Sequence, residues 1–447
     1  MTIDNYAGHI AKLTRTYTDA LQYVANEGPQ PGAVLVHSGT ENHYYGDDRG
    51  VAFQAYGHLL HWISVNRPNQ FVYFRPGERP IYFQIVPSDF WYEQGIDIAP
   101  EWEETLTIVR LSSLDELSVQ LKQDCVSDIA YIGGDDDIAA SFGIDKSLIN
   151  PKKLLAYLDF SRAVKTHYEL EQLRAANRLA LLGHAAAKVR FLEGGSEYEI
   201  HMAFLQATQN LEDECPYTNI VALNEKAAIL HYQFKRKINE DKGRVLLIDA
   251  GCKVRAYGSD ITRTSVSEDV HPEFRSLVTA MEALELALVD EVKPGKTYQS
   301  LHASTLTRIA SVLVDHKICT GEAADLIELN IPQLFMPHGV GHLLGIQVHD
   351  VGGHQSDING TILPPPENSP ALRNTRAMEV DMVFTVEPGL YFIPLILEAE
   401  RSSDRGKLIN WNAVDELYPC GGIRIEDNIR VTSDGAENLT RQFELKE

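Results

Sequence analysis

The sequence lacks the features that mark several classes of protein. Its 447 residues contain only five cysteines. Their odd number and the absence of a Cys-x-x-Cys pair argue against a disulfide framework and a thiolate zinc site. No apolar run approaches the length of a membrane span, and residues 1–5 have neither the basic region nor the apolar core of a secretory signal. These absences predict a cytoplasmic protein.

Basic residues are scarce relative to acidic ones. The chain has 40 Lys and Arg against 63 Asp and Glu, which gives a formal net charge of −23. This balance argues against nucleic acid and against an anionic membrane as partners, because both attract basic surfaces. The length allows two or three domains with ample core.

The first 160 residues alternate between helical and strand-like segments. Apolar residues at helical spacing predict a helix over 9–26. Short apolar runs predict strands over 33–36, 71–74, 80–85 and 129–132. The alternation indicates a smaller mixed α/β domain over residues 1–160.

Residues 161–447 contain longer helical segments. A helix is predicted over 166–192, closed by two glycines. Ser196 and Glu199 form a capping box that opens a second helix, which runs to about residue 210. Further helices are predicted over 272–292 and 298–317. The proline-rich loop 352–376 is expected to cover part of a site.

The segment 336–350 places three histidines, His338, His342 and His349, among glycines and aliphatic residues. Each glycine disfavours a helix by up to about 1 kcal/mol relative to alanine. We therefore predict a glycine-rich loop that runs into a buried strand and approaches a ligand or a metal closely.

Four acidic residues, Asp249, Asp260, Glu387 and Glu426, stand beside apolar strand-like segments. If Asp249 and Asp260 lie on a hairpin, their odd separation allows them to face each other directly. Two facing carboxylates repel and need a cation or a shared proton between them. A single acid of this kind would be better explained as part of a turn at the end of a strand. Four of them together with the histidine loop indicate a site.

These segments resemble the pita-bread metallopeptidases, which include methionine aminopeptidase, aminopeptidase P and prolidase. The five-ligand pattern of that family matches Asp249, Asp260, His342, Glu387 and Glu426. Among its members the chain is most similar to bacterial prolidases (Xaa-Pro dipeptidases) and the organophosphorus acid anhydrolases. Segments 216–225, 228–232 and 347–353 carry that similarity. The resemblance implies an α/β (α+β) protein with a pita-bread catalytic domain over 161–447.

The ligand set is rich in oxygen, which suits Mn²⁺, Co²⁺ or Fe²⁺ better than structural zinc. Its carboxylates outnumber the needs of one ion, so two divalent ions per subunit are expected, with Mn²⁺ preferred. The resemblance assigns Asp249 and Asp260 to one metal and Asp260, His342 and Glu387 to the other. Glu426 would bridge the two ions.

The resemblance also implies roles around the metals. Glu387 would carry a proton to the leaving nitrogen, and His349 would donate a hydrogen bond to the oxyanion. His231 and His338 would line the substrate site. Arg424 would bind the carboxylate of the C-terminal proline, and its position two residues before Glu426 places both side chains on one face. The implied pocket walls, for which ordinary packing is the alternative, are Tyr217, Leu230, Tyr298, Val348 and Leu372.

The segment 43–48 resembles a loop that reaches into the active site of the partner subunit in prolidases. In that reading the chain is a homodimer, and Asp47 contributes to the partner's substrate site. A solvated acidic turn is the alternative for Asp47.

The expected activity is the hydrolysis of Xaa-Pro dipeptides, with the hydrolysis of organophosphorus esters as a side reaction. Aminopeptidase P, which acts on longer peptides, is the main alternative. Methionine aminopeptidase usually lacks a large N-terminal domain, and a creatinase-like enzyme lacks the ligand set. A pita-bread protein that only binds partners would have lost ligands, and none is lost here.

Overall fold

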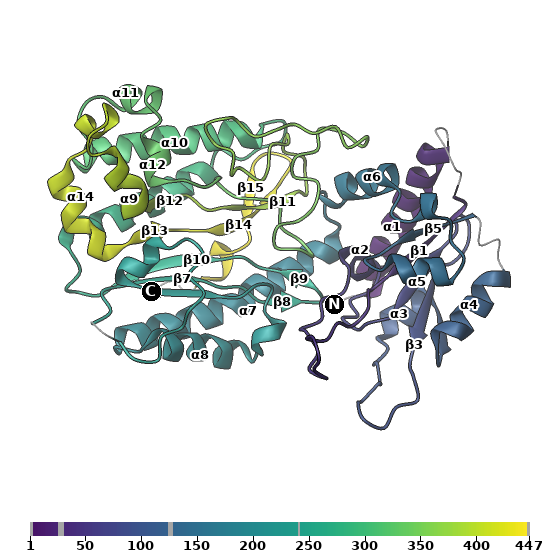
Figure 1. Ribbon diagram of the computed structural model, residues 1–447. Helices are drawn as coiled ribbons and strands as arrows, with labels where there is room; N and C mark the ends of the chain where they lie inside the picture. Colours follow the sequence, from purple (N-terminus) through teal and green to yellow (C-terminus); the bar gives the residue numbers. More distant parts are fainter. Residues whose placement is uncertain (1–2, 26–30, 124–127, 240–241, 445–447) are drawn as a thin grey trace. The chain divides into compact units, whose positions relative to one another are not determined.

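The computed structural model describes residues 3–25, 31–123, 128–239 and 242–444 (Figure 1). The chain divides into two compact units. The first unit consists of Met1–Glu171 with Asp357–Thr361. The second consists of Gln172–Ser356 with Ile362–Glu447. Each unit is described by itself below.

The first unit contains a five-stranded mixed sheet with the order β4-β3-β2-β1-β5. β1 runs parallel to β5 and antiparallel to β2, and β3 runs parallel to β4. The four predicted strands are confirmed, and the one missed, β4, is a more exposed strand without a clear apolar pattern. The strands are β1 (Ala33–His37), β2 (Phe71–Phe74), β3 (Ile81–Ile85), β4 (Thr107–Leu111) and β5 (Ile129–Ile132).

Six α-helices accompany this sheet in the described part of the first unit. The helix predicted over 9–26 is confirmed as α1, which begins six residues earlier at Ile3, and its predicted last residue lies outside the described residues. Tyr17 of α1 packs edge-on against Trp62, with ring centroids 4.9 Å apart. The helices are α1 (Ile3–Ala25), α2 (Gly57–Trp62), α3 (Pro100–Thr105), α4 (Leu114–Gln123), α5 (Asp136–Ser141) and α6 (Lys152–Arg162).

The helices of the second unit begin and end close to their predicted limits. The capping box is confirmed: the Glu199 carboxylate accepts from the Ser196 backbone N–H at 2.8 Å, and the Ser196 hydroxyl accepts from the Glu199 backbone N–H at 3.3 Å. The helices are α7 (His167–Leu192), α8 (Glu197–Thr208), α9 (Pro272–Val289), α10 (Tyr298–Asp315), α11 (Ala323–Glu328), α12 (Pro332–Phe335), α13 (Pro394–Leu397) and α14 (Trp411–Leu417).

Short antiparallel strands form the centre of the second unit, with α7 and α8 on one side and α9 and α10 on the other (Figure 1). One sheet has the order β10-β7-β6 and another the order β11-β14-β15, and two further pairs join β12 to β13 and β8 to β9. The strands are β6 (Ile220–Leu223), β7 (Val245–Asp249), β8 (Lys253–Val254), β9 (Tyr257–Gly258), β10 (Thr262–Val266), β11 (Val383–Val386), β12 (Gly389–Tyr391), β13 (Gly422–Arg424), β14 (Asp427–Val431) and β15 (Ala436–Asn438).

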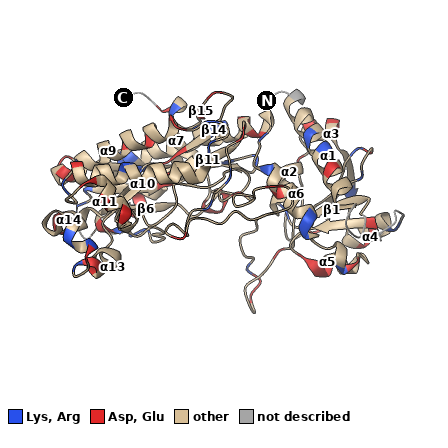
Figure 2. Ribbon diagram, turned by 90° about the horizontal axis from the view of Figure 1, so that it is seen from above, with Lys and Arg blue, Asp and Glu red and all other residues tan. Residues whose placement is uncertain are grey.

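Figure 2 shows acidic and basic residues interspersed on the helices. Within the described ranges, no helix is long and apolar enough to cross a membrane.

Candidate metal centre and active site

The hairpin that carries the two aspartates has a tight turn at Arg255 and Ala256, whose φ angles are 51° and 73°. Two positive φ angles are typical of a two-residue hairpin turn. This turn sets a register in which Asp249 pairs with Thr262. The prediction that Asp249 and Asp260 face each other directly is therefore wrong. Asp260 lies two residues before Thr262, and because alternate residues share a face, both carboxylates still lie on the same side of the hairpin.

The histidine loop forms without a helix, as predicted, but the expected buried strand is wrong. Only an isolated bridge between Leu343 and Phe384 has strand geometry in this segment. The loop follows β11 closely, because the backbone N–H of Thr385 donates to the carbonyl of His342 at 2.9 Å. Gly341 has a φ of 147°, and a Cβ atom there would lie 2.3 Å from the Thr385 carbonyl oxygen. Glycine is required at this position for the loop to approach the strand.

Three of the predicted metal ligands converge in the second unit. Asp260, His342 and Glu426 each offer a ligand atom, and these atoms all lie within 4.8 Å of one another. His342 Nε2 lies 3.3 Å from Asp260 Oδ2 and 3.6 Å from Glu387 Oε1. The Nδ1 atom of His342 lies 3.0 Å from the Leu343 carbonyl oxygen. A proton on Nδ1 satisfies that carbonyl and leaves Nε2 with a lone pair, as a metal ligand requires.

A cavity of about 250 Å³ joins these ligands to most of the other predicted site residues. The loop 352–376 contributes Ala371 and Arg373 to its wall, in agreement with the expectation that this loop covers part of the site. The predicted residues that line the cavity are Leu230, His231, Asp249, Asp260, His338, His342, His349, Glu387, Arg424 and Glu426.

Four predicted pocket residues are not among the side chains that line this cavity. Tyr217 donates its hydroxyl to Asp249 Oδ1 at 2.7 Å, and Tyr298 donates to the Thr385 carbonyl at 2.6 Å. Leu372 is buried against Gly339, and Val348 is half-buried beside His349.

Asp47 belongs to the first unit, where it lies in an exposed turn. Its carboxylate accepts a hydrogen bond from the backbone N–H of Arg49 at 3.1 Å.

Burial and the charges of neighbouring groups act together on the carboxylates at the centre of the cavity. Burial, followed by the neighbouring carboxylates, raises the pKa of Glu426 well above its usual value. Burial also raises the pKa of Glu387, to about 7, and that of Asp249. For Asp260, burial is outweighed by the hydrogen bond and charge of His342, which hold its pKa below the usual value. Buried carboxylates that repel one another in this way are suited to a shared cation.

Arg424 is buried beside the carboxylates and makes three side-chain hydrogen bonds. It donates to Asp249 Oδ2 at 2.6 Å, to the Tyr391 hydroxyl at 2.8 Å and to Thr262 Oγ1 at 3.1 Å. The same Thr262 hydroxyl donates to Glu426 Oε2 at 2.6 Å. Arg424 and Glu426 therefore share a face, as predicted.

Sequence reasoning missed Tyr391. Its hydroxyl lies 3.0 Å from His338 Nε2 as well as 2.8 Å from Arg424, so it connects two predicted substrate residues. In the sequence, a tyrosine in an apolar strand looks the same whether it belongs to the core or to the site.

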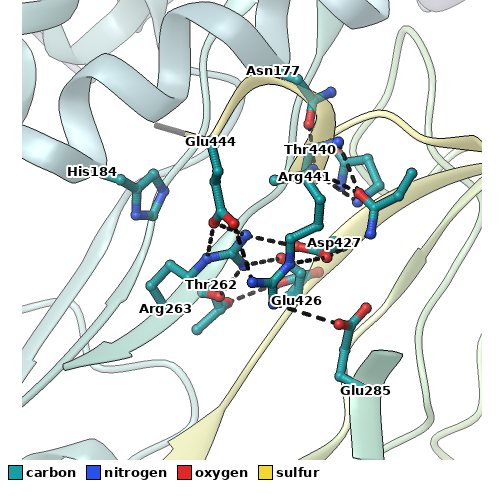
Figure 3. A network of polar contacts seen from close by, with 12 residues as sticks. Asn177, His184, Thr262, Arg263, Glu285, Glu426, Asp427, Thr440, Arg441 and Glu444 are labelled. Atoms are coloured by element: carbon teal, nitrogen blue, oxygen red, sulfur yellow. Dashed lines mark hydrogen bonds and ion pairs between the residues drawn. The ribbon is translucent and has the colours of Figure 1, made fainter. Parts of the chain in front are cut away.

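Figure 3 shows a network of ion pairs around Glu426 whose other members are not among the residues that line the cavity. Arg263 donates to the Glu426 carbonyl at 2.9 Å and to Asp427 Oδ1 at 2.7 Å. Arg441 donates to the other Asp427 oxygen at 2.7 Å, and Glu444 accepts from Arg263 at 2.8 Å. Arg263 thus holds the backbone of Glu426 directly, and both half-buried guanidinium groups hold the side chain of the next residue, Asp427.

Comparison with known proteins gives matches over both units. Residues 171–433 match the model of metallopeptidase family M24, and residues 4–160 match the model described as the Xaa-Pro dipeptidase N-terminal domain. The Xaa-Pro dipeptidase of Shewanella sp. (strain ANA-3) is 40% identical over 444 residues, which cover 99% of this chain and 98% of the relative. That of Shewanella oneidensis is 41% identical over 441 residues, or 98% of each chain.

Solved structures with a similar fold include aminopeptidases P. The zinc-substituted enzyme of Escherichia coli in complex with product has a TM-score of 0.73 and 23% identity, over 97% of this chain and 96% of that one. Proline aminopeptidase P II from Yersinia pestis has a TM-score of 0.72 and 23% identity, over 97% of both chains. At this identity the likeness concerns the fold.

Proposed function

The chain belongs to metallopeptidase family M24, with the pita-bread fold and a mixed α/β N-terminal domain, and from this membership we propose that it hydrolyses Xaa-Pro dipeptides with two divalent metal ions. The observation that carries the proposal is one cavity that joins an oxygen-rich ligand cluster to a buried guanidinium group. The cluster can bind the metals that hydrolysis requires. The guanidinium can bind the free carboxylate of a dipeptide and so select it.

The donor set fits two divalent ions of the Mn²⁺ class. The residues proposed to hold them are Asp249, Asp260, His342, Glu387 and Glu426, four carboxylates and one imidazole without a thiolate. When bound, such ions supply a nucleophilic water near neutral pH and polarise the substrate carbonyl. Mn²⁺ is the preferred ion, with Co²⁺ or Fe²⁺ as alternatives.

The protein's own groups then handle protons and charge. Glu387 lines the cavity beside His342 and is proposed to pass a proton to the leaving nitrogen of proline. His349 is proposed to donate a hydrogen bond to the developing oxyanion. His231 and His338 line the same cavity and would contact the substrate.

Arg424 has the geometry to receive the carboxylate of a C-terminal proline. A guanidinium has five N–H groups, and three are used on Asp249, Tyr391 and Thr262. One N–H remains on each of Nη1 and Nη2. A guanidinium can bind one carboxylate through two hydrogen bonds from its two Nη atoms.

We also propose a homodimer in which Asp47 of one subunit neutralises the free amine of a dipeptide bound by the other. Tyr217, Leu230, Tyr298, Val348 and Leu372 are proposed as walls of the substrate pocket. A cytoplasmic location and a side activity on organophosphorus esters belong to the same proposal.

The assay that tests this function uses metal-stripped protein refilled with single metals. We expect Gly-Pro-type dipeptides to be cleaved with Mn²⁺ and poorly with Zn²⁺, and a Xaa-Pro tripeptide to be cleaved more slowly than the dipeptides. A tripeptide that is cleaved faster than the dipeptides would favour aminopeptidase P activity. Full activity in protein shown by elemental analysis to hold no transition metal would exclude the dinuclear mechanism.

A further inference from the structure

Asn428 is a fully buried side chain on β14, two residues after Glu426. Its side-chain oxygen accepts a hydrogen bond from the backbone N–H of Asp260 at 3.1 Å. Its side-chain nitrogen donates to the backbone carbonyl of Asp260. One carboxamide therefore satisfies both backbone polar groups of a proposed metal ligand.

The two hydrogen bonds between Asn428 and Asp260 continue a line of contacts between two sheets, which we call the seam. β10 is the edge strand of its sheet, and on its outer edge the Glu426 N–H donates to the Thr262 carbonyl at 3.0 Å. The same antiparallel register, continued by two residues along each segment, places Asn428 opposite Asp260. The side chain of Asn428 makes the two bonds that a strand backbone would make at this position.

The backbone of Asn428 is already committed to another segment. Its N–H donates to the hydroxyl of Thr440 at 3.0 Å, and its carbonyl accepts from Leu439 at 2.8 Å. The Thr440 hydroxyl in turn donates to Asn177 on α7 at 2.8 Å (Figure 3). Asn428, Thr440 and Asn177 are all fully buried. The backbone of Asn428 is thus fixed by Leu439 and Thr440, and its side chain is free to bind the backbone of Asp260.

We propose that Asn428 is a positioning residue that sets the spacing between Asp260 and Glu426, the two carboxylates proposed to bridge the metals. The inference rests on the proposed dinuclear function. Metal–ligand distances vary by only about 0.2 Å in well-formed sites, so a small displacement of the Asp260 backbone would weaken both metal positions. The seam fixes Glu426 through Thr262 and Asp260 through Asn428.

The chemistry of the contact requires an amide. An asparagine side chain both accepts from an N–H group and donates to a carbonyl. Leucine has a similar size but does neither, and serine is too short to replace both bonds. Loss of a residue that orients a metal ligand typically weakens metal binding or activity by about 10–100-fold. We expect Asn428→Ser and Asn428→Leu to bind Mn²⁺ with affinity reduced to this extent.

Asn224 offers a matched control. It is another buried asparagine whose side chain accepts from a backbone N–H, that of Arg244 at 2.7 Å, and donates to a backbone carbonyl, that of Lys242 at 3.1 Å. These contacts lie at the start of β7, away from the carboxylate end. Asn224→Ser removes the same kind of clamp, so it should lower the melting temperature without changing Mn²⁺ affinity.

The experiment titrates Mn²⁺ into metal-stripped full-length protein by calorimetry, with paramagnetic resonance to count free ions. Wild type and Asn224→Ser are expected to bind two ions per chain with equal affinity, and Asn428→Ser to bind them at least about tenfold more weakly. Wild-type affinity in Asn428→Ser overturns the positioning role. So does an equal loss in Asn224→Ser, because general destabilisation then explains both.

Asn428→Leu provides a second measurement if the serine variant does not fold. Wild-type Mn²⁺ affinity in folded Asn428→Leu likewise overturns the inference. A wild-type protein that binds no Mn²⁺ would instead reject the proposed dinuclear function, and the two failures are therefore distinguishable.

Discussion

Glu426 is a buried carboxylate among other carboxylates, and burial, followed by the charges of Asp260, Glu387 and Asp249, raises its pKa. A bridging ligand in such a place neutralises the cations on both sides. We expect Glu426→Gln, which keeps the shape of the side chain and removes its charge, to lower the affinity for Mn²⁺ by at least about tenfold. Elemental analysis after dialysis measures the metal content. Glu379→Gln, at an exposed carboxylate that pairs with the buried Arg376, serves as the control and should retain its metal.

The role proposed for Arg424 would distinguish dipeptidase from aminopeptidase chemistry through one side chain. Removal of one partner of a buried charge pair costs about 2–5 kcal/mol. At about 1.4 kcal/mol per factor of ten, Arg424→Ala should lower kcat/KM for a Xaa-Pro dipeptide by a hundredfold or more. The variant should also lose most of the preference of the wild type for Xaa-Pro over Xaa-Pro-amide, because it lacks the positive charge proposed to bind the carboxylate.

The ratio between acid and amide substrates is the informative quantity for Arg424. Arg424 also donates to Asp249, so its loss can lower the overall rate through the metal site, and metal content must be measured alongside. A change in overall rate leaves the ratio unaffected. An Arg424→Ala variant that discriminates as sharply as wild type would contradict the assigned role.

Residue types were more predictable than their contacts. The four acids and His342 could be singled out because each lies beside an apolar segment, and a buried charge in such a place requires a partner. Tyr391 and Asn428 could not, since a tyrosine in a short strand is also an ordinary core residue, and the sequence does not show which groups an asparagine side chain bonds. The facing arrangement of Asp249 and Asp260 failed because the register depends on a turn whose residues, Arg255 and Ala256, give no turn signal in the sequence.

At the scale of secondary-structure elements, two helices of the first unit meet the first turn of α7, whose residues up to Glu171 belong to the same unit, at one polar cluster. His9 of α1, His61 of α2 and Glu169 of α7 offer side-chain atoms within 4.8 Å of one another. His61 Nε2 lies 3.3 Å from Glu169 Oε1, and His9 Nε2 donates to the His61 carbonyl at 2.7 Å. Burial lowers the pKa of His61 from 6.5 to about 4. The pKa of Glu169 is also lowered, because the histidines outweigh the effect of burial.

Both shifts make this cluster sensitive to acid. Below pH 6.5 the unfolded chain protonates His61, while the folded chain keeps it neutral until about pH 4, so folding stability falls across this window. The contribution of Glu169 is present above its usual pKa and is lost at lower pH, in the same direction. We expect the melting temperature to drop between pH 7 and pH 5, and His61→Gln to reduce that drop. An unchanged pH dependence in His61→Gln would show that His61 is protonated equally in both states.

Elements were the best-predicted level of the fold. Helix ends with a local chemical cause, such as the Ser196–Glu199 capping box, were placed correctly from the sequence. The strand expected after the histidine loop was wrong because its apolar residues pair with β11 through backbone contacts without forming a ladder. Such pairing depends on a segment about forty residues away in the chain, and periodicity within the loop carries no information about it.

For the whole molecule, we predict a homodimer whose subunits complete each other's active sites. The turn that carries Asp47 is exposed, and Tyr45 beside it is fully exposed. A large exposed aromatic next to an acid is poorly explained by a solvated turn, since aromatic side chains are enriched at interfaces. An Asp47 carboxylate at the partner's site would attract the free amine of a dipeptide and disfavour blocked N-termini.

Mixed dimers test this arrangement directly. Asp47→Ala should impair substrate binding only at the partner's site, and Glu387→Gln should abolish catalysis only at its own. In a dimer with one subunit of each kind, one site has both defects and the other has both intact residues, so activity of about half the wild-type value should return on mixing. This recovery requires that Asp47 act across the subunit boundary, because an Asp47 that served its own site would leave each site of the mixed dimer with one defect. A monomer with full activity, or a proven mixed dimer as inactive as its parents, would contradict the prediction and leave Asp47 as an acidic surface residue.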